Sequence, residues 1–334
     1  METRSLGKSH LTVQPVILGA WAIGGWFWGG TDDDAAVDAI RASLDAGISG
    51  IDTAPVYGCG HSETVVGRAI AGRRDEVCLM TKVGLRWDDD RGAKFFDAEG
   101  ADGQTLPIYR NLRADSIKTE VEASLKRMNV DHIDLVQCHW PDPTTPVEET
   151  MKALASLVNE GVVGAIGVSN FDESLLARAE RALDGLPLSS NQPKYSLLNR
   201  KIEEDILPWC RLHQVGVIAY SPMERGLLTG KVTMEREFAD SDGRSWDPMF
   251  TAENRRLVLN ALAKAQEIAD SHGCTLAQLA AAWVFHQPGV TAAIVGARTP
   301  QQARENAKAA DVQLSESDTT MLGSLFGEVQ LSRS

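Results

Sequence analysis

One repeated unit constrains the fold of this chain more than any other feature: a short apolar run followed by an amphipathic stretch of helical periodicity. Eight such units follow one another along the sequence. The apolar runs predict strands that are buried on both faces, and the amphipathic stretches predict helices that cover them. The paired segments are 16–18 with 32–46, 50–52 with 61–71, 77–80 with 113–128, 133–137 with 146–159, 165–168 with 172–182, 189–191 with 202–213, 215–219 with 275–286, and 291–295 with 300–309.

Eight parallel strands, each followed by a helix, are the number that closes a barrel. The rival fold, an open doubly wound sheet, normally carries G-x-G-x-x-G after its first strand. Here the segment GCGHSE (residues 58–63) lacks the third glycine, and the turn at 19–30 has the wrong glycine spacing. The sequence therefore predicts an α/β fold, a (β/α)8 TIM barrel. Since no low-complexity linker divides the chain, we expect one domain over residues 1–334.

The composition limits the possible partners. The chain has 33 Lys and Arg against 46 Asp and Glu, and its formal net charge of −13 argues against nucleic acid or an anionic membrane as a partner. Five scattered cysteines without a C-x-x-C pair argue against a disulfide framework or a zinc cluster and are typical of a reducing cytoplasm. The first residues lack the apolar core of a signal peptide, and no apolar run approaches the roughly 20 residues of a membrane span. We expect a cytoplasmic protein that acts on small molecules, with no metal site; the oligomeric state is left open.

Two loops are long enough to suggest a function. Gly84–Leu112 follows the third predicted strand, and Ser221–Arg256 follows the seventh and could close over a ligand. Both follow carboxyl ends of strands, where active sites of barrels are built, although plain surface elaboration is the alternative for each. Aromatic residues of the first loop could form a pocket wall: Trp87, Phe95, Phe96 and Tyr109.

Four ionisable residues fall at or just beyond the ends of three consecutive predicted strands. Asp52 ends the second strand, Tyr57 follows it, Lys82 ends the third and His139 ends the fourth. Each has a structural alternative: a turn cap, a loop aromatic, a solvated charge and a core histidine. Adjacent strands of a closed barrel bring such positions together at one mouth, so the four together favour a site.

The chemistry of this set is coherent. A tyrosine titrates near ~10, too high for a good acid at neutral pH without help. An ammonium at Lys82 would stabilise the phenolate and lower the pKa of Tyr57, and Asp52 could supply the counter-charge that keeps Lys82 protonated. His139 could hydrogen-bond a carbonyl oxygen and aim it at Tyr57. The set exchanges protons with oxygen but holds no hydride source, so redox chemistry would need a cofactor.

Several segments, in this order, resemble the aldo-keto reductase superfamily over nearly the whole chain. They are IDTAPVYG (51–58), SETVVG (62–67), Thr81-Lys82, IDLVQCHWPDP (133–143), GAIGVSNF (164–171), NQPKYSLLNR (191–200), AYSPMERGLLTGK (219–231) and IVGARTPQQAREN (294–306). The resemblance implies a TIM barrel that binds NADPH across its carboxyl-terminal mouth. It also implies that Asp52, Tyr57, Lys82 and His139 are the tetrad of the family, with Tyr57 as general acid and base.

The resemblance extends to the expected cofactor site. Ser169, Asn170 and Gln192 match partners of the nicotinamide carboxamide, and Tyr220 matches the aromatic residue on which the nicotinamide stacks. The pyrophosphate loop matches Ser221, Gly226, Leu227, Thr229 and Lys231. The segment after the eighth strand contributes Gly296, Ala297, Arg298, Gln302, Glu305 and Asn306 toward the adenosine end.

The segment after the eighth predicted strand can also be interpreted from physical chemistry alone. Thr299, Pro300 and Gln302 form the pattern of a capping box with proline at the first helical position. Such a helix start after the eighth strand is an anion site, and Arg298 could clamp the adenosine 2′-phosphate, which favours NADP over NAD. Gln302 could instead be occupied as a cap. The segment departs from the Lys-Ser pattern of aldose-reductase-like members and resembles a bacterial branch with inositol-operon, general-stress, and methylglyoxal or glycerol-type reductases.

Five tryptophans follow the first, third and fourth predicted strands and suggest an aromatic pocket wall, with core burial as the alternative. They are Trp21, Trp26, Trp28, Trp87 and Trp140. An enclosed pocket of this kind would suit small aldehydes, ketones or polyols such as glyceraldehyde and glycerol.

The first hypothesis is an NADP-dependent oxidoreductase that interconverts small carbonyls and alcohols. The alternative is a cofactor-sensing regulatory subunit like the β-subunits of potassium channels, which have the same tetrad; the short segment before the first strand argues against it. A metal-dependent hydrolase would need clustered ligands at strand ends, and of the seven histidines only His139 clearly lies there.

Overall fold

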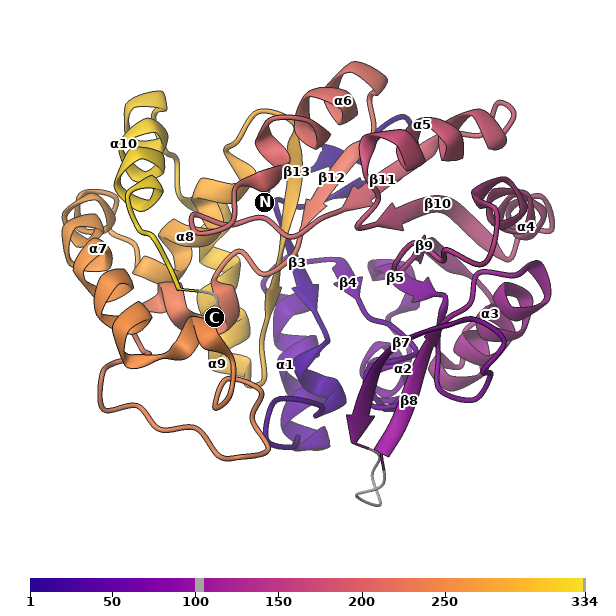
Figure 1. The fold of residues 1–334 in the computed structure, drawn as a ribbon, viewed down its shortest axis with the longest axis horizontal. Helices are drawn as coiled ribbons and strands as arrows, with labels where there is room; N and C mark the ends of the chain where they lie inside the picture. The colour runs from indigo at the N-terminus through magenta and orange to yellow at the C-terminus, as the bar shows by residue number, and fades with distance from the viewer. Residues whose placement is uncertain (100–104, 333–334) are drawn as a thin grey trace.

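The computed structural model describes residues 1–99 and 105–332, and it confirms the barrel (Figure 1). Eight parallel strands close in the order β10-β11-β12-β13-β3-β4-β5-β9. Their bounds are β3 (Val16–Gly19), β4 (Gly50–Asp52), β5 (Cys78–Val83), β9 (Ile133–Cys138), β10 (Val163–Ser169), β11 (Leu188–Gln192), β12 (Gly216–Ala219) and β13 (Val290–Gly296). The predicted runs lie within these strands or overlap them.

Helices surround this barrel. The predicted helices correspond to α1 (Asp33–Asp45), α2 (His61–Ile70), α3 (Ala114–Met128), α4 (Val147–Asn159), α5 (Glu173–Ala182), α6 (Ile206–His213), α8 (Leu276–Phe285) and α9 (Pro300–Ala307). Two more were not predicted, α7 (Ala252–Ser271) and α10 (Glu316–Gly327). Both carry start signals: the Thr251 side chain caps α7, and Ser315 with Asp318 forms a capping box at α10.

The inside of the barrel changes from apolar to polar along its axis. A buried apolar cluster near the amino ends includes Ile17, Met80, Leu135 and Ile218. Leu6, Leu11 and Val13 extend it from the hairpin of β1 (Arg4–Ser5) and β2 (Thr12–Val13). Since side chains of a strand alternate between its faces, the residues two positions further along point inward as well. Lys82 and Gln137 are two such residues, and they make the interior polar toward the carboxyl ends.

The long loop at 84–112 contains a small sheet that was not predicted from the sequence. Strands β6 (Leu85–Arg86), β8 (Thr105–Arg110) and β7 (Ala93–Glu99) pair antiparallel in that order. Residues 100–104 of the predicted loop lie outside the described residues. The second loop holds two short helices, η4 (Glu224–Thr229) and η5 (Pro248–Phe250), and α7 begins within its predicted range.

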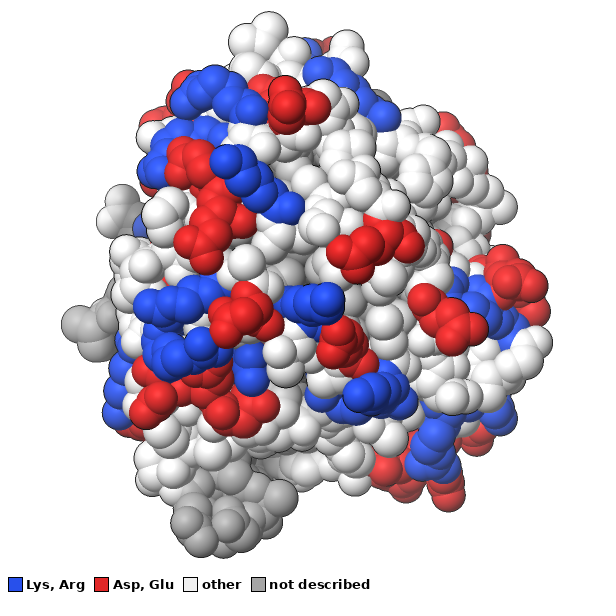
Figure 2. All heavy atoms as spheres, turned by 90° about the vertical axis from the view of Figure 1, so that its right-hand side faces the viewer, with Lys and Arg blue, Asp and Glu red and all other residues white. Residues whose placement is uncertain are grey.

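The face of the molecule around α3 and α4 carries charges of both signs (Figure 2). Basic and acidic side chains alternate there, with ion pairs such as Arg178–Glu148 and Arg91–Asp115. This face therefore shows no broad basic surface of the kind that binds nucleic acid. Across the described ranges, no helix combines the length and apolar character that crossing a membrane requires.

Candidate active site

Three of the four predicted ionisable residues are joined by hydrogen bonds at the carboxyl end of the barrel. Asp52 ends β4, Lys82 lies next to the last residue of β5, and Tyr57 lies in the loop after β4. The Lys82 Nζ donates to Asp52 Oδ1 across 2.5 Å, to the Thr53 carbonyl across 3.0 Å and to the Tyr57 hydroxyl across 3.3 Å. Both members of the ion pair are buried, with Lys82 1% and Asp52 4% exposed. The ammonium is therefore held between a carboxylate and a phenol.

His139 joins this group directly after β9. Its ring lies 5.6 Å from the Tyr57 ring, centroid to centroid, and the two planes are nearly perpendicular at 83°. Its backbone carbonyl accepts a hydrogen bond of 3.2 Å from Asn170 Nδ2. The structure thus brings all four predicted residues together at one mouth.

Burial dominates the proton affinities of this group. Burial raises the pKa of Tyr57 above its ordinary value, and the Lys82 ammonium offsets only part of this rise. The prediction that Lys82 lowers the pKa of Tyr57 has the right sign for the contribution of Lys82, but burial makes the net shift of this pKa upward. Burial alone would lower the pKa of Lys82, yet Asp52 and Tyr57 outweigh it and raise that pKa. Burial, with help from Lys82, holds the pKa of His139 well below its ordinary value, so its imidazole is neutral at physiological pH.

Polar residues beside His139 form a second chain of hydrogen bonds. The Tyr220 hydroxyl donates to Asn170 Oδ1 across 3.0 Å, and Asn170 Nδ2 donates to Ser169 Oγ across 3.0 Å. The Ser169 hydroxyl in turn donates to the Gln192 carbonyl across 2.7 Å. Four residues that match the expected nicotinamide partners therefore support one another.

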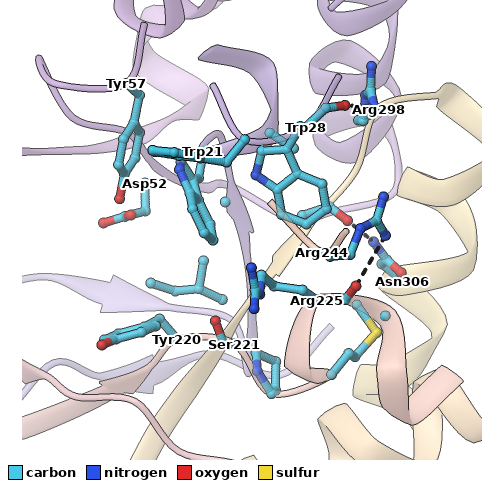
Figure 3. Close-up of a pocket in the computed structure, with 18 of the residues that line it drawn as sticks. Trp21, Trp28, Asp52, Tyr57, Tyr220, Ser221, Arg225, Arg244, Arg298 and Asn306 are labelled. Atoms are coloured by element: carbon cyan, nitrogen blue, oxygen red, sulfur yellow. Dashed lines mark hydrogen bonds between the residues drawn. The ribbon is translucent and has the colours of Figure 1, made fainter. Parts of the chain in front are cut away.

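A cavity of about 710 Å³ opens at this mouth. Figure 3 shows Asp52, Tyr57 and Tyr220 at one end and Arg244, Arg298 and Asn306 at the other. Predicted residues along its wall include Trp21, Trp26, Trp28, Asp52, Tyr57, Phe96, His139, Trp140, Ser169, Asn170, Gln192, Tyr220, Ser221, Gly226, Thr229, Lys231, Gly296, Arg298, Gln302, Glu305 and Asn306. Most of the residues predicted at separate strand ends thus share one space.

Some predicted residues do not line this cavity. Leu227 and Ala297 are each 1% exposed and pack into the main hydrophobic core. Trp87 packs instead against the apolar cluster of Ala54 and Val56 under the small sheet. Phe95 reaches the wall only indirectly, by packing on Trp140 at 5.2 Å between ring centroids.

The helix start after β13 differs in detail from the predicted capping box. The Thr299 hydroxyl accepts a hydrogen bond of 3.2 Å from the backbone N–H of Gln302, as expected. The Gln302 side chain, however, accepts from the backbone amide of Arg298 at 2.8 Å, so the reciprocal bond of a box is replaced by one that holds Arg298. The Arg298 guanidinium donates to the carbonyls of Trp28 at 3.0 Å and Gly30 at 2.6 Å. It ties the loop after β3 to the mouth of the cavity.

Three arginines of the loop after β12 line the cavity and were missed from the sequence: Arg225, Arg236 and Arg244. Arg225 pairs with Asp247, and Arg244 pairs with Asp242 at 2.6 Å. The available signal was the presence of three arginines in a glycine-containing loop that follows the seventh strand.

The start of this loop has unusual backbone geometry. Ser221, Glu224 and Arg225 all have positive φ, at 57°, 43° and 51°, a conformation that non-glycine residues rarely adopt. Glu224 is 1% exposed, and its carboxylate accepts from the Ser196 hydroxyl at 2.6 Å and pairs with Lys194 Nζ at 2.7 Å. These contacts anchor the loop to the segment after β11.

The Aldo/keto reductase family model matches residues 15–325. The chain belongs to this family. As an aldo/keto reductase it is an NAD(P)-dependent oxidoreductase, which agrees with the barrel and with the prediction from the motifs.

Three similar proteins illustrate the range of the family. An NADH-specific methylglyoxal reductase of Escherichia coli is 37% identical over 328 residues, 96% of this chain and 97% of the relative. The glycerol dehydrogenase AKR11B4 from Gluconobacter oxydans has a solved structure that is 37% identical, with a TM-score of 0.85 over 98% of this chain and 95% of the other. A probable voltage-gated potassium channel subunit beta of Arabidopsis thaliana is 33% identical over 322 residues, 93% of this chain and 92% of the relative.

The cavity of this aldo/keto reductase fits the nicotinamide dinucleotide that the family uses. Tyr220, a flat side chain, lies at the end that holds Tyr57, and the polar Asn170 accepts its hydrogen bond there. Cationic side chains, which suit phosphate groups, line the rest of the cavity: Figure 3 shows Arg225 near its middle and Arg244 and Arg298 at the other end, and Lys231 also lines the wall.

Proposed function

We propose that this aldo/keto reductase reduces small uncharged aldehydes and ketones with NADPH and catalyses the reverse oxidation of small alcohols and polyols. The dinucleotide, when bound, supplies or accepts the hydride. The observation that carries the proposal is the Tyr57 hydroxyl within 3.3 Å of the buried Lys82 ammonium, at the end of a cavity with an aromatic wall.

In this proposal Tyr57 is the general acid of reduction and the general base of oxidation. As the carbonyl oxygen gains negative charge, the phenol donates its proton to it, and the Lys82 ammonium stabilises the phenolate that remains. Asp52 keeps Lys82 charged. The neutral His139 donates a hydrogen bond to the substrate oxygen and directs it toward Tyr57, a role that an imidazole with a lowered pKa can fill without a charge of its own.

The substrate end of the cavity supports small, neutral molecules. Trp21 and Trp28 meet edge to face at 5.4 Å between ring centroids, and Trp21 lies 6.5 Å from the Tyr57 ring. Trp26 and Trp140 line the same cavity. The names of the methylglyoxal reductase and the glycerol dehydrogenase support an α-oxoaldehyde or a glyceraldehyde and glycerol pair as substrates.

We propose NADP as the preferred dinucleotide because Arg298 and Arg244 line the end of the cavity by α9. A 2′-phosphate adds negative charge there, and guanidinium groups bind phosphate well. The NADH-specific relative makes this preference the point to measure first.

A panel assay tests the proposal. Purified protein is mixed with methylglyoxal, glyceraldehyde or a simple ketone and either NADPH or NADH, and loss of the reduced nicotinamide absorbance is followed; glycerol with NADP⁺ tests the reverse direction. We expect steady turnover with at least one aldehyde and a higher kcat/KM with NADPH than with NADH.

The second candidate is a cofactor-sensing regulatory subunit, which the similarity to a probable potassium channel subunit beta favours. Tight dinucleotide binding without steady turnover on any carbonyl of the panel would support this role and contradict the first.

A further inference from the structure

The Asp52 carboxylate has a second set of partners that the tetrad does not include. While Oδ1 accepts from Lys82, Oδ2 accepts from Gln192 Nε2 at 2.8 Å and from Gln137 Nε2 at 3.2 Å. Gln137 lies in β9, is fully buried and is not among the residues that line the cavity. A buried side-chain amide of this kind needs hydrogen-bond partners, and Asp52 is one of them.

The two glutamines reach each other across the intervening strand β10. They can do so because Gly167, in that strand, has no side chain: a Cβ at this position would lie 2.9 Å from Gln137 Cγ and 2.3 Å from Ser190 Oγ. The space that Gly167 leaves is therefore occupied by the side chains that hold Asp52.

Hydrogen bonds fix the orientation of the Gln137 amide. Its Oε1 accepts from Gln192 Nε2 at 3.2 Å and from the Ser190 hydroxyl at 3.5 Å. With its oxygen turned toward β11, Gln137 presents its N–H group to Asp52. Both hydrogens of Gln192 Nε2 are likewise used, one on Asp52 and one on Gln137.

The Gln192 side chain consequently presents its oxygen to the cavity. Among residues 1–99 and 105–332, no group donates a hydrogen bond to Gln192 Oε1, and the residue lines the cavity wall. It is an acceptor that suits the NH₂ group of a carboxamide.

We propose that Gln137 is a positioning residue with two effects, an inference that rests on the function proposed above. It holds the Asp52 carboxylate so that Oδ1 keeps Lys82 beside Tyr57. It also fixes the Gln192 amide so that its oxygen faces the dinucleotide. The proton affinity of the phenol and the affinity for the dinucleotide are therefore linked through one buried amide.

The sign of the first effect follows from the charges. The negative charge of Asp52 raises the pKa of Tyr57 and the positive charge of Lys82 lowers it. The Gln137 N–H group stabilises the carboxylate and weakens its field at the phenol. Loss of this group raises the pKa of Tyr57, and alcohol oxidation, which needs the phenolate, then requires a higher pH.

The test compares Gln137→Met with Gln14→Met. Methionine keeps the length of glutamine but has neither an N–H donor nor a strong acceptor. Gln14 is also buried, at the amino end of the barrel, where its Oε1 accepts from the amide and hydroxyl of Ser49. The control therefore removes a buried amide from the same barrel without touching Asp52.

For Gln137→Met we expect kcat of alcohol oxidation to fall about tenfold at neutral pH and its rise with pH to move up by about 0.5–1 unit. Quenching of tryptophan fluorescence by NADP⁺, measured without substrate, gives a Kd that we expect to increase about fivefold to tenfold. Gln14→Met is expected to keep the pH profile and the Kd of the wild type. Gly167→Ala, which displaces Gln137 without removing it, is expected to change both readouts in the same direction.

A Gln137→Met enzyme with the pH profile and dinucleotide Kd of Gln14→Met overturns the inference while leaving the proposed function intact. Absence of turnover in the wild type contradicts the proposed function instead. If Gln137→Met does not fold, the same two measurements on Gly167→Ala decide: unchanged values overturn the inference.

Discussion

The Lys82 ammonium donates a hydrogen bond of 3.3 Å to the Tyr57 hydroxyl, although Lys82 comes from strand β5 and Tyr57 from the loop after β4. The closed barrel makes this contact possible, because Asp52 pairs with Met80 on the adjacent parallel strand. Lys82 follows Met80 by two residues and Tyr57 follows Asp52 by five, so both reach the same mouth of the barrel. Burial favours the protonated phenol, and the ammonium stabilises the phenolate that proton transfer would leave. The same pair thus suits an acid in one direction and a base in the other.

His139 should make the protein sensitive to acid. Because burial holds its folded-state pKa well below 6.5, the unfolded chain binds a proton that the folded chain does not, and stability falls as the pH drops below about 6.5. His139→Asn should lose less free energy of unfolding between pH 7 and pH 5 than the wild type, as measured by urea denaturation. Equal losses in the two proteins would contradict a buried neutral imidazole.

Glu120 should make the stability of the protein depend on pH in the opposite direction. Burial raises its pKa to about 8, while Arg86 and the Gly84 amide oppose the rise. A raised folded-state pKa means that the stability gained from the protonated form is present below about 4.5 and is lost as the pH rises toward 8. Glu120→Gln keeps an acceptor for the Gly84 amide and should flatten this dependence. Urea denaturation at pH 5 and pH 8 measures it; a wild-type slope retained in the variant would refute the assignment.

The Lys194–Glu224 pair should stabilise both the fold and the loop after β12. Lys194→Met leaves the buried Glu224 carboxylate, among the residues that the structure describes, with the Ser196 hydroxyl as its one side-chain partner. This should cost about 2–3 kcal/mol, less than for a fully buried pair because Lys194 is 31% exposed. We also expect KM for the dinucleotide to rise severalfold with little change in KM for the carbonyl. The double variant Lys194→Met/Glu224→Gln is the matched control and should recover most of the lost stability. A double variant as unstable as the single one would show that the charge pair is not the cause.

Arg298 should discriminate between the two dinucleotides. Arg298→Met removes a guanidinium from the end of the cavity by α9 and should raise KM for NADPH about tenfold, with a smaller effect on NADH. Steady-state kinetics with both dinucleotides measure the ratio. If both KM values rise equally, Arg298 acts only through its bonds to the Trp28 and Gly30 carbonyls.

Much of this architecture could be predicted because it depends on local patterns. The eight units of strand and helix define the barrel, and the strand ends bring Asp52, Lys82 and His139 to one mouth because parallel strands share a direction. The order of the motifs was enough to indicate the family.

The missed features depend on register, packing and burial, which the local pattern of residues does not specify. The antiparallel pairing of β7 and β8 follows from a register that short runs do not specify. The bonds from Gln137 to Asp52 and Gln192 require the space above Gly167, which only the packed barrel reveals. The net rise in the pKa of Tyr57 is a third case, since burial outweighs the neighbouring charge that the sequence suggested.

Replacement of Tyr57 tests the central claim most directly. Tyr57→Phe removes only the hydroxyl, so NADPH should still quench the tryptophan fluorescence with a Kd within about twofold of the wild type, while kcat for the best aldehyde of the panel falls by about three orders of magnitude or more. Turnover within tenfold of the wild type, with NADPH bound normally, would contradict the account of a phenol and an ammonium that exchange a proton with the substrate oxygen.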